Sequence, residues 1–258
     1  MNEKTLKIGW LFPDSLYLHG DRGNVLAMKR MGESAGFNVE IEKIDFDTDD
    51  FTPTDYDFII CPPGEIAVFA SIIEWLRPYT LSLKAYIQMG RPLLVTGNSI
   101  GLWGNTILRD DGSTIKGLEI LDITTKENPA IYGDDLYFKC TVGEQSMEIL
   151  GCQIQMADIT LGDELSFGHL YYGYGNTGKD RQEGVQIKNS VFTNTLGPIL
   201  VTNPWLTKSF VEIIAQNQEV SLDNWQVDMQ LEMLSLKTKK QFITNKATDL
   251  TNCPRGKA

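Results

Sequence analysis

The first half of the chain alternates short apolar runs with longer segments in which apolar residues recur at helical spacing. Four apolar runs predict strands, at residues 6–12, 39–44, 57–61 and 92–96. Helical spacing over residues 24–35 and 66–89 predicts helices between them, the second interrupted near Pro78 because proline has no amide hydrogen to donate. Short strands separated by helices indicate an α/β fold with a mostly parallel, doubly wound sheet covered on both faces.

The second half is richer in strand-like segments, which we expect to extend or flank the first sheet. They lie at residues 118–124, 136–142, 147–156 and 185–192. Helical spacing returns at residues 204–216, where Asn203 is a candidate N-cap and Pro204 takes the favoured first helical position. A last helical pattern covers residues 225–236, and the polar tail from there to Ala258 is expected to be loose.

The chain shows neither an internal repeat nor a low-complexity linker, so its 258 residues fit one large domain. We expect that domain to span residues 1–220, with a C-terminal helix and loose tail over 221–258. The net charge of −11 argues against a nucleic-acid partner, because phosphate binding depends on clustered lysine and arginine. No apolar stretch approaches the roughly 20 residues of a membrane span, and the first apolar run is too short for a signal peptide, so we expect a cytoplasmic protein.

The four cysteines are scattered and form no Cys-x-x-Cys pair; they are Cys61, Cys140, Cys152 and Cys253. With His19 and His169 as the only histidines, the sequence has no spacing typical of a zinc site or of a disulfide framework. We therefore expect no metal and no cofactor, and interpret the cysteines as small buried hydrophobic residues.

The run Leu93–Gly104, LLVTGNSIGLWG, follows a predicted buried strand and contains the pattern Gly-x-Ser-x-Gly centred on Ser99. This spacing resembles a nucleophile elbow, a strained turn between a strand and a helix that exposes one reactive side chain. Two interpretations of Ser99 are open. It is either a nucleophile, with His169 as its base and an acid such as Asp163 or Glu164, or the cap of the following short helix.

Four further stretches together resemble a known family. In chain order they read LYLHGDRGNVLAMKR, GLEILDITT, GYGNTGKDRQEGVQIKN and GPILVTNPWLTKSF. The ordered set resembles class I glutamine amidotransferases of the cobyric-acid-synthase type, most closely the glutaminase subunit of lipid II isoglutaminyl synthase. The resemblance implies a flavodoxin-like α/β fold and hydrolysis of glutamine by a cysteine nucleophile. It also implies delivery of the ammonia to a Mur-ligase-like partner that amidates a cell-wall precursor.

The resemblance implies three functional positions, and each departs from the family pattern. The family's elbow cysteine aligns with Gly97, and its catalytic histidine aligns with Leu196. The loop that supplies an oxyanion amide in the family reads Cys61-Pro62-Pro63-Gly64 here, and proline has no amide hydrogen. The sequence therefore predicts a catalytically degenerate member that serves as a structural or regulatory subunit.

Two other functions are open on the sequence. Ser99 with His169 would make an active hydrolase or amidotransferase, whereas a pocket that keeps its shape without chemistry would make a sensor for a small amino-acid-like ligand. Further pocket or interface candidates are Asp21, Arg22, Asn24 and Asn98, the first three from the GDRGN stretch and the last from the elbow. The GDRGN stretch either contacts a partner subunit or the rim of the site, or simply starts the first helix.

Overall fold

The first of two sheets is the doubly wound sheet that the sequence predicts. The structure is a computed structural model that describes residues 4–249. Six strands form this sheet: β1 (Thr5–Leu11), β2 (Asn38–Ile44), β3 (Phe58–Cys61), β4 (Leu93–Thr96), β11 (Val185–Ile187) and β12 (Ser190–Thr193). Their order is β11-β12-β4-β3-β1-β2, and neighbouring strands are parallel except for β11 with β12. The predicted α/β class with a mostly parallel sheet is confirmed.

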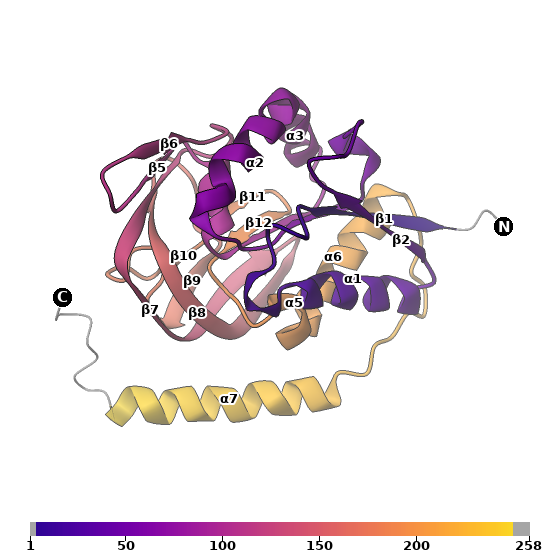
Figure 1. The fold of residues 1–258 in the computed structure, drawn as a ribbon. Helices are drawn as coiled ribbons and strands as arrows, with labels where there is room; N and C mark the ends of the chain where they lie inside the picture. Colours follow the sequence, from indigo (N-terminus) through magenta and orange to yellow (C-terminus); the bar gives the residue numbers. More distant parts are fainter. Residues whose placement is uncertain (1–3, 250–258) are drawn as a thin grey trace.

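Helices cover both faces of this sheet (Figure 1). One face carries α1 (Arg22–Ser34), α5 (Ile199–Thr202) and α6 (Pro204–Asn217), and the other carries α2 (Phe69–Leu76) and α3 (Thr80–Gln88). Alternate residues of a strand enter different cores, so that in β3 Ile60 packs with α1 and α6 whereas Ile59 packs with α2 and α3. A 3-10 turn that contains Pro78 separates α2 from α3, which confirms the predicted interruption.

A second, mostly antiparallel sheet carries the β-rich part of the chain. Its strands are β5 (Thr106–Leu108), β6 (Thr114–Lys116), β7 (Ile123–Val142), β8 (Gln145–Leu161), β9 (Gly168–Tyr172) and β10 (Gln182–Glu183). The long β7–β8 hairpin contains the predicted strands 136–142 and 147–156. The sheet is built around β7, which pairs with β5, β8 and β9.

The predicted strand at residues 118–124 is wrong over most of its length. Only its last two residues belong to a strand, the start of β7. The amides of Leu118 and Leu121 instead donate to carbonyls of the short helix α4 (Ile100–Trp103), and both side chains are buried. Their apolar spacing reflects burial in the core rather than strand pairing.

Two other expectations need correction. The run 185–192 is a hairpin of two strands, because a tight turn that begins at Lys188, with φ of +52°, separates β11 from β12. Asn203 and Pro204 do occupy the N-cap and first position of α6, but no capping hydrogen bond forms. The Asn203 amide instead donates to the Leu150 carbonyl (2.8 Å) and accepts from the Leu150 N–H (2.9 Å), because β8 passes beside it.

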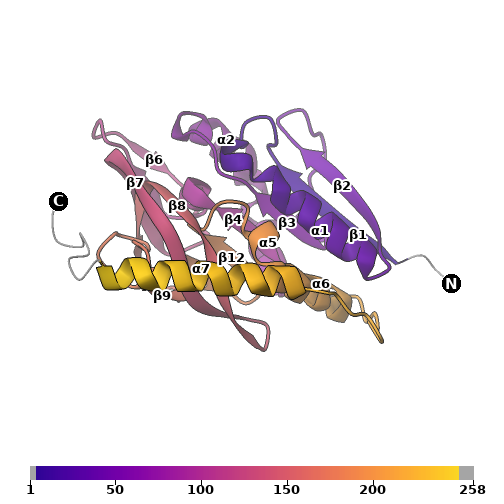
Figure 2. The ribbon, with the colours of Figure 1, turned by 90° about the horizontal axis from the view of Figure 1, so that it is seen from below.

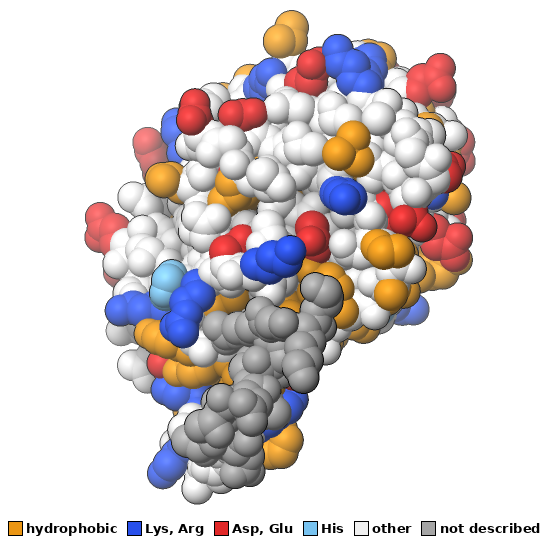
Figure 3. All heavy atoms as spheres, turned by 90° about the vertical axis from the view of Figure 1, so that its left-hand side faces the viewer, with side chains coloured by type: hydrophobic (Ala, Val, Ile, Leu, Met, Phe, Trp, Pro, Cys, Tyr) orange, Lys and Arg blue, Asp and Glu red, His pale blue; other side chains and the backbone are white. Residues whose placement is uncertain are grey.

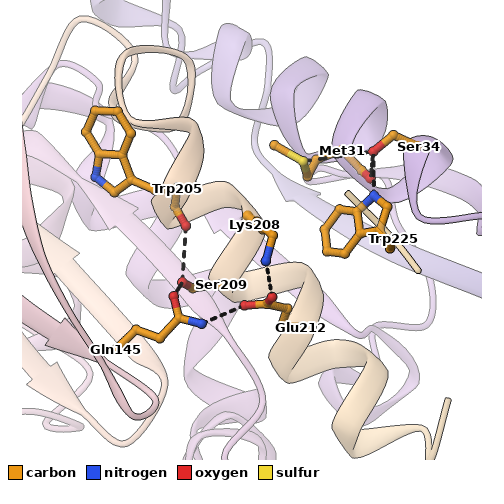
Figure 4. Close-up of polar contacts among 8 residues, drawn as sticks. All are labelled: Met31, Ser34, Gln145, Trp205, Lys208, Ser209, Glu212 and Trp225. Carbon is orange, nitrogen blue, oxygen red and sulfur yellow. Dashed lines mark hydrogen bonds and ion pairs between the residues drawn. The ribbon is translucent and has the colours of Figure 1, made fainter. Parts of the chain in front are cut away.

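The C-terminal segment differs most from its prediction. The helix expected over 225–236 starts later and is longer, as α7 (Gln230–Asp249), and residues 218–229 form an irregular strap before it. Trp225 of the strap donates from Nε1 to the Ser34 hydroxyl (3.2 Å) and lies under the Lys208 ammonium, which ties the strap to α1 and α6 (Figure 4). Residues 250–258 of the expected loose tail lie outside the described residues. The division of the chain at residue 220 stays a prediction.

α7 lies along the outside of the molecule, beside the long strands of the second sheet (Figure 2). Leu236 and Ile243 are buried against that sheet, Lys240 forms an ion pair with Glu148 (2.6 Å), and Lys246 pairs with two aspartates of β7. These long-range contacts explain why a polar segment expected to be loose is helical. None of the helices in residues 4–249 is long and apolar enough to cross a membrane.

Candidate functional site

The elbow lies where β4 ends, at the carboxyl edge of the first sheet. Gly97 follows Thr96 directly, has φ of +60°, and begins a 3-10 turn that leads into α4. This left-handed backbone conformation strains any residue that carries a Cβ. Gly97 is therefore the tip of the turn between strand and helix, whereas Ser99 lies two residues further, at the N-cap of α4.

Gly97, Pro63 and Leu196 meet at this elbow although they are far apart in the sequence. A Cβ placed on Gly97 would lie 2.9 Å from the Pro63 Cβ and 3.3 Å from the Leu196 Cδ2. These are the positions at which the resemblance implies the nucleophile, the oxyanion loop and the histidine. The fold thus brings all three together, but the side chains that meet there are apolar or absent.

The buried Pro62–Gly64 loop is clamped against the elbow by two polar side chains. The Ser99 hydroxyl donates to the Pro62 carbonyl (2.6 Å), and the Asn98 amide donates to the Gly64 carbonyl (2.6 Å). The Gly64 N–H in turn donates to Asn98 Oδ1 (3.3 Å). Because the two prolines have no N–H, the one amide hydrogen of this loop is already used inside the chain.

The GDRGN stretch does more than start α1, because its buried Asp21 and Asn24 reach other elements of the site. The Thr96 hydroxyl donates to the Asp21 carboxylate, and the Leu200 N–H donates to Asn24 Oδ1 (2.8 Å). Burial raises the pKa of Asp21 to about 6, while the hydrogen bond from Thr96 acts in the opposite direction. Arg22, by contrast, is exposed. The stretch therefore joins the last residue of β4 to the start of α5.

A buried polar network holds the segment that carries Leu196. Leu196 exchanges two backbone hydrogen bonds with Cys152 of β8, of 2.8 and 3.2 Å. Just before it in the chain, the Asn194 N–H donates to the buried carboxyl of Glu183 (2.7 Å), whose two oxygens lie 3.0 and 3.1 Å from the Thr193 hydroxyl. Burial raises the pKa of Glu183 to about 8, so this carboxyl is largely protonated at neutral pH.

The structure does not bring Ser99 to His169. Ser99 is fully buried with its hydroxyl on the Pro62 carbonyl, whereas His169 is exposed on β9 of the second sheet. The predicted capping role is wrong as well, because that hydroxyl makes no bond to a helical N–H. Cys61 is also a poor nucleophile where it lies, since complete burial raises the pKa of its thiol to about 12.

Two residues of this region are absent from the candidates that the sequence offers. Thr96 is the last residue of an ordinary buried strand, and its partner Asp21 lies 75 positions away. Glu183 lies in the GYGNTGKDRQEGVQIKN stretch, but the charged and polar residues around it are typical of a surface turn and do not single it out. Both are found only when distant segments pack together.

Replacing Ser99 by alanine is expected to lower the free energy of unfolding by about 1–2 kcal/mol, because it removes a buried hydrogen bond to the clamped loop. Urea denaturation followed by tryptophan fluorescence measures the change. Ser82→Ala is the matched control, since its hydroxyl bonds to the Tyr79 carbonyl within a helix at a partly buried position. An equal loss in both variants would contradict a specific role of Ser99 in holding the loop.

The sheet order and the elbow after β4 match a fold known from solved structures. A solved glutamine amidotransferase matches the structure with a TM-score of 0.52 at 18% identity, covering 81% of this chain and 98% of that one. The chain has the flavodoxin-like fold of class I glutamine amidotransferases. No family model matches the sequence.

Two relatives make the resemblance more particular, and both are named lipid II isoglutaminyl synthase (glutamine-hydrolyzing) subunit GatD. The one from Staphylococcus aureus (strain N315) is 26% identical over 243 residues, which cover 94% of this chain and 96% of the relative. The one from Streptococcus pneumoniae (strain ATCC BAA-255 / R6) is 27% identical over 201 residues, covering 77% and 76%. The resemblance read from the motifs is therefore confirmed: the chain is similar to GatD subunits over most of its length.

Proposed function

We propose that this chain is a catalytically degenerate, GatD-like glutamine amidotransferase subunit that acts in the cytoplasm as a structural or regulatory partner of a Mur-ligase-like protein. One observation carries the proposal. Gly97 stands at the tip of the elbow, where a nucleophile would have to stand, and Pro63 and Leu196 close the space that its side chain would need.

Hydrolysis of glutamine by the family mechanism needs a thiolate, a base that moves its proton, and donors that stabilise the oxyanion. Gly97 offers no nucleophile, and Leu196 cannot accept a proton. Pro62 and Pro63 offer no N–H, and the Gly64 N–H is held by Asn98. The nucleophile, the base and the oxyanion donors are thus all missing from the positions where the family mechanism needs them. Their absence supports a role without glutamine hydrolysis.

Two features support a role as the partner of another protein: the similarity of the chain to named subunits and the ordered loops around the elbow. Its relatives are named as subunits, and it is similar to one of them over 94% of its length. The polar contacts of Asp21, Asn24 and Glu183 hold the loops around the elbow in a fixed arrangement although no chemistry remains there to position. A fixed surface of this shape is what a partner subunit would recognise.

The test is glutamate release from glutamine by the purified chain, alone and with a co-expressed Mur-ligase-like protein. We expect no release above background in either case, together with co-elution of the two proteins on size exclusion. The Staphylococcus aureus relative serves as the positive control for the assay, because its name describes it as glutamine-hydrolyzing.

Variants separate the possible sources of activity. Release that disappears in Ser99→Ala would show that the nucleophile has moved two residues along the elbow, and release that disappears in Cys61→Ala would show that the buried thiol reacts. Either result overturns the proposal. Failure of the chain to bind any Mur-ligase-like protein would overturn the partner role and leave the loss of catalysis standing.

A further inference from the structure

A groove of about 620 Å³ lies between α1 on one side and the strap with the start of α7 on the other. Its floor includes α5, which lies between α1 and the N-terminal end of α7 (Figure 2). We call it the α1–strap groove. Its volume falls within the range of roughly 300–1,000 Å³ that is typical of pockets for small ligands.

Hydrogen bonds within the chain hold the walls of this groove in place. The Leu200 N–H donates to Asn24 Oδ1 (2.8 Å), and the Thr207 hydroxyl donates to the Leu200 carbonyl (2.7 Å). The Ser34 hydroxyl, at the edge of the groove, accepts from Trp225 Nε1 (3.2 Å), and this bond ties the strap to α1 (Figure 4). A pocket whose walls are already fixed loses little conformational entropy when a ligand binds.

Most of the lining is apolar. Leu26 on α1 and Val201 on α5 are exposed by 52% and 53%, and Met31, Pro204 and Met229 lie in the same lining. Apolar side chains that leave water on binding supply much of the binding free energy of a concave site. The lining therefore favours a ligand with apolar side chains.

Charged side chains of opposite sign stand on opposite walls of the groove. Arg30 belongs to α1, whereas Asp228 and Glu232 belong to the end of the strap and the start of α7. Within residues 4–249, none of these three side chains forms an ion pair. Over the upper part of the face in Figure 3, by contrast, acidic and basic side chains lie close together. The groove thus separates two charges that a ligand can match.

This separation indicates a ligand with a negative end, a positive end and an apolar middle. An arginine guanidinium binds a carboxylate through two parallel hydrogen bonds, and carboxylates pair with an ammonium group. Because Arg30 does not reach the acids on the other wall, the charges of the ligand must also stand apart. A peptide spans about 3.3–3.6 Å per residue, so two or three residues hold their free ends about 7–11 Å apart. A single amino acid carries both charges on one carbon.

We propose that the α1–strap groove binds an apolar peptide of two or three residues with free ends. The peptide carboxylate lies on Arg30, its ammonium group lies on Asp228 and Glu232, and its side chains pack on the apolar lining. None of the three residues that meet at the elbow lines this groove. The site is therefore separate from the elbow, and it does not depend on the proposed loss of catalysis or on a partner protein.

The test is isothermal titration calorimetry of the full chain with leucyl-leucine. We expect saturable binding of one peptide per chain, with a dissociation constant below about 1 mM. Acetylation of the amino end and amidation of the carboxyl end should each weaken binding at least tenfold, and free leucine should bind at least tenfold more weakly than the dipeptide. These comparisons all use the unchanged protein.

Substitutions then assign the carboxylate to its partner. Arg30→Gln should weaken binding of leucyl-leucine at least tenfold, yet leave binding of the amidated peptide unchanged, because that peptide has no carboxylate to lose. The double variant Asp228→Asn, Glu232→Gln should act in the same way on the free and the acetylated peptide. Lys29→Gln is the matched control, since Lys29 is on α1 outside the groove, and it should leave binding unchanged.

Three results overturn the proposal. The first is the absence of saturable binding up to about 10 mM. The second is equal binding of a peptide blocked at both ends, which would mean that the groove recognises apolar side chains alone. The third is equal weakening by Arg30→Gln and Lys29→Gln. None of these results changes the outcome expected in the glutaminase assay, so failure here and failure of the proposed function are distinguishable.

Discussion

Raising the pH from about 5 to about 8.5 is expected to destabilise the protein strongly, and the variant Glu183→Gln is expected to resist that loss. Burial raises the pKa of the Glu183 carboxyl to about 8 in the folded chain, against an ordinary value of 4.5. Between these two values the folded state binds more protons than the unfolded state, so stability falls as the pH rises through this window. A pKa difference of this size corresponds to on the order of 5 kcal/mol of folding free energy, fully lost above about pH 8.

Polar groups surround the buried carboxyl of Glu183. The Thr193 hydroxyl lies within 3.1 Å of both carboxyl oxygens and 2.9 Å from the Thr195 hydroxyl, and the Asn194 N–H donates to one carboxyl oxygen (2.7 Å). These hydrogen bonds favour the ionised form, but the cost of burying a charge is larger, so the pKa stays raised. Burial raises the pKa of the Cys140 thiol, and Glu183 raises it further once its carboxyl ionises.

Urea denaturation at a series of pH values measures the effect. The wild type should lose stability between about pH 5 and about pH 8. Glu183→Gln should lose only the smaller part that Asp21, with a pKa of about 6, contributes below about pH 6, and should stay nearly constant from there to about pH 8 because an amide does not ionise. Glu40→Gln, at an exposed position of β2, is the matched control and should follow the wild type. Parallel curves for the wild type and Glu183→Gln would contradict the predicted protonation.

Replacing Gly97 by alanine is expected to lower the free energy of unfolding by about 2–4 kcal/mol. Roughly 1 kcal/mol comes from placing a Cβ on a residue with φ of +60°. The remainder comes from the contacts that this Cβ would make, at 2.9 Å from a proline ring that has little freedom to move. A cysteine at this position carries the same Cβ and meets the same obstacle.

Gly143→Ala separates the two contributions. Gly143 has nearly the same backbone, with φ of +58°, but a Cβ there would meet nothing closer than 3.7 Å. This control should lose only the conformational part, about 1 kcal/mol. In a Pro63→Gly background, Gly97→Ala should cost close to what the control costs, because the obstructing ring is gone and the remaining close contact, 3.3 Å, is with the end of the flexible Leu196 side chain. An equally large loss in both backgrounds would place the strain elsewhere.

The hydrophobic pattern and the turn residues predict the first sheet well, because the apolar periodicity within each of its strands and helices matches the face that the segment buries. β3 and β4 are apolar throughout, as the two-sided sheet requires, and Pro78 interrupts its helix where predicted. The hydrophobic pattern fails to predict secondary structure where a buried segment forms its backbone hydrogen bonds outside a sheet. Leu118 and Leu121 are buried like strand residues, yet their amides bond to α4, which no local signal encodes.

At the site, the sequence indicates which positions depart from the family pattern but not how they are arranged. The alignment places glycine, leucine and proline at the three functional positions; the structure adds that Gly97 has a left-handed backbone and that Pro63 fills the space in front of it. The same limit applies to Ser99 and His169, whose separation depends on how the two sheets pack together.

The sequence by itself determined the α/β class, the parallel core of the first sheet and the resemblance to glutamine amidotransferases, because these depend on local periodicity and on ordered motifs. Only the tertiary structure decided that Asp21 lies against Thr96, that Glu183 is buried, and that the segment after residue 236 is a helix packed against the second sheet. The physical reason is common to all three. Contacts between residues 75 or more positions apart, or between separate elements, set burial and hydrogen bonding, and these long-range terms override what each segment prefers alone.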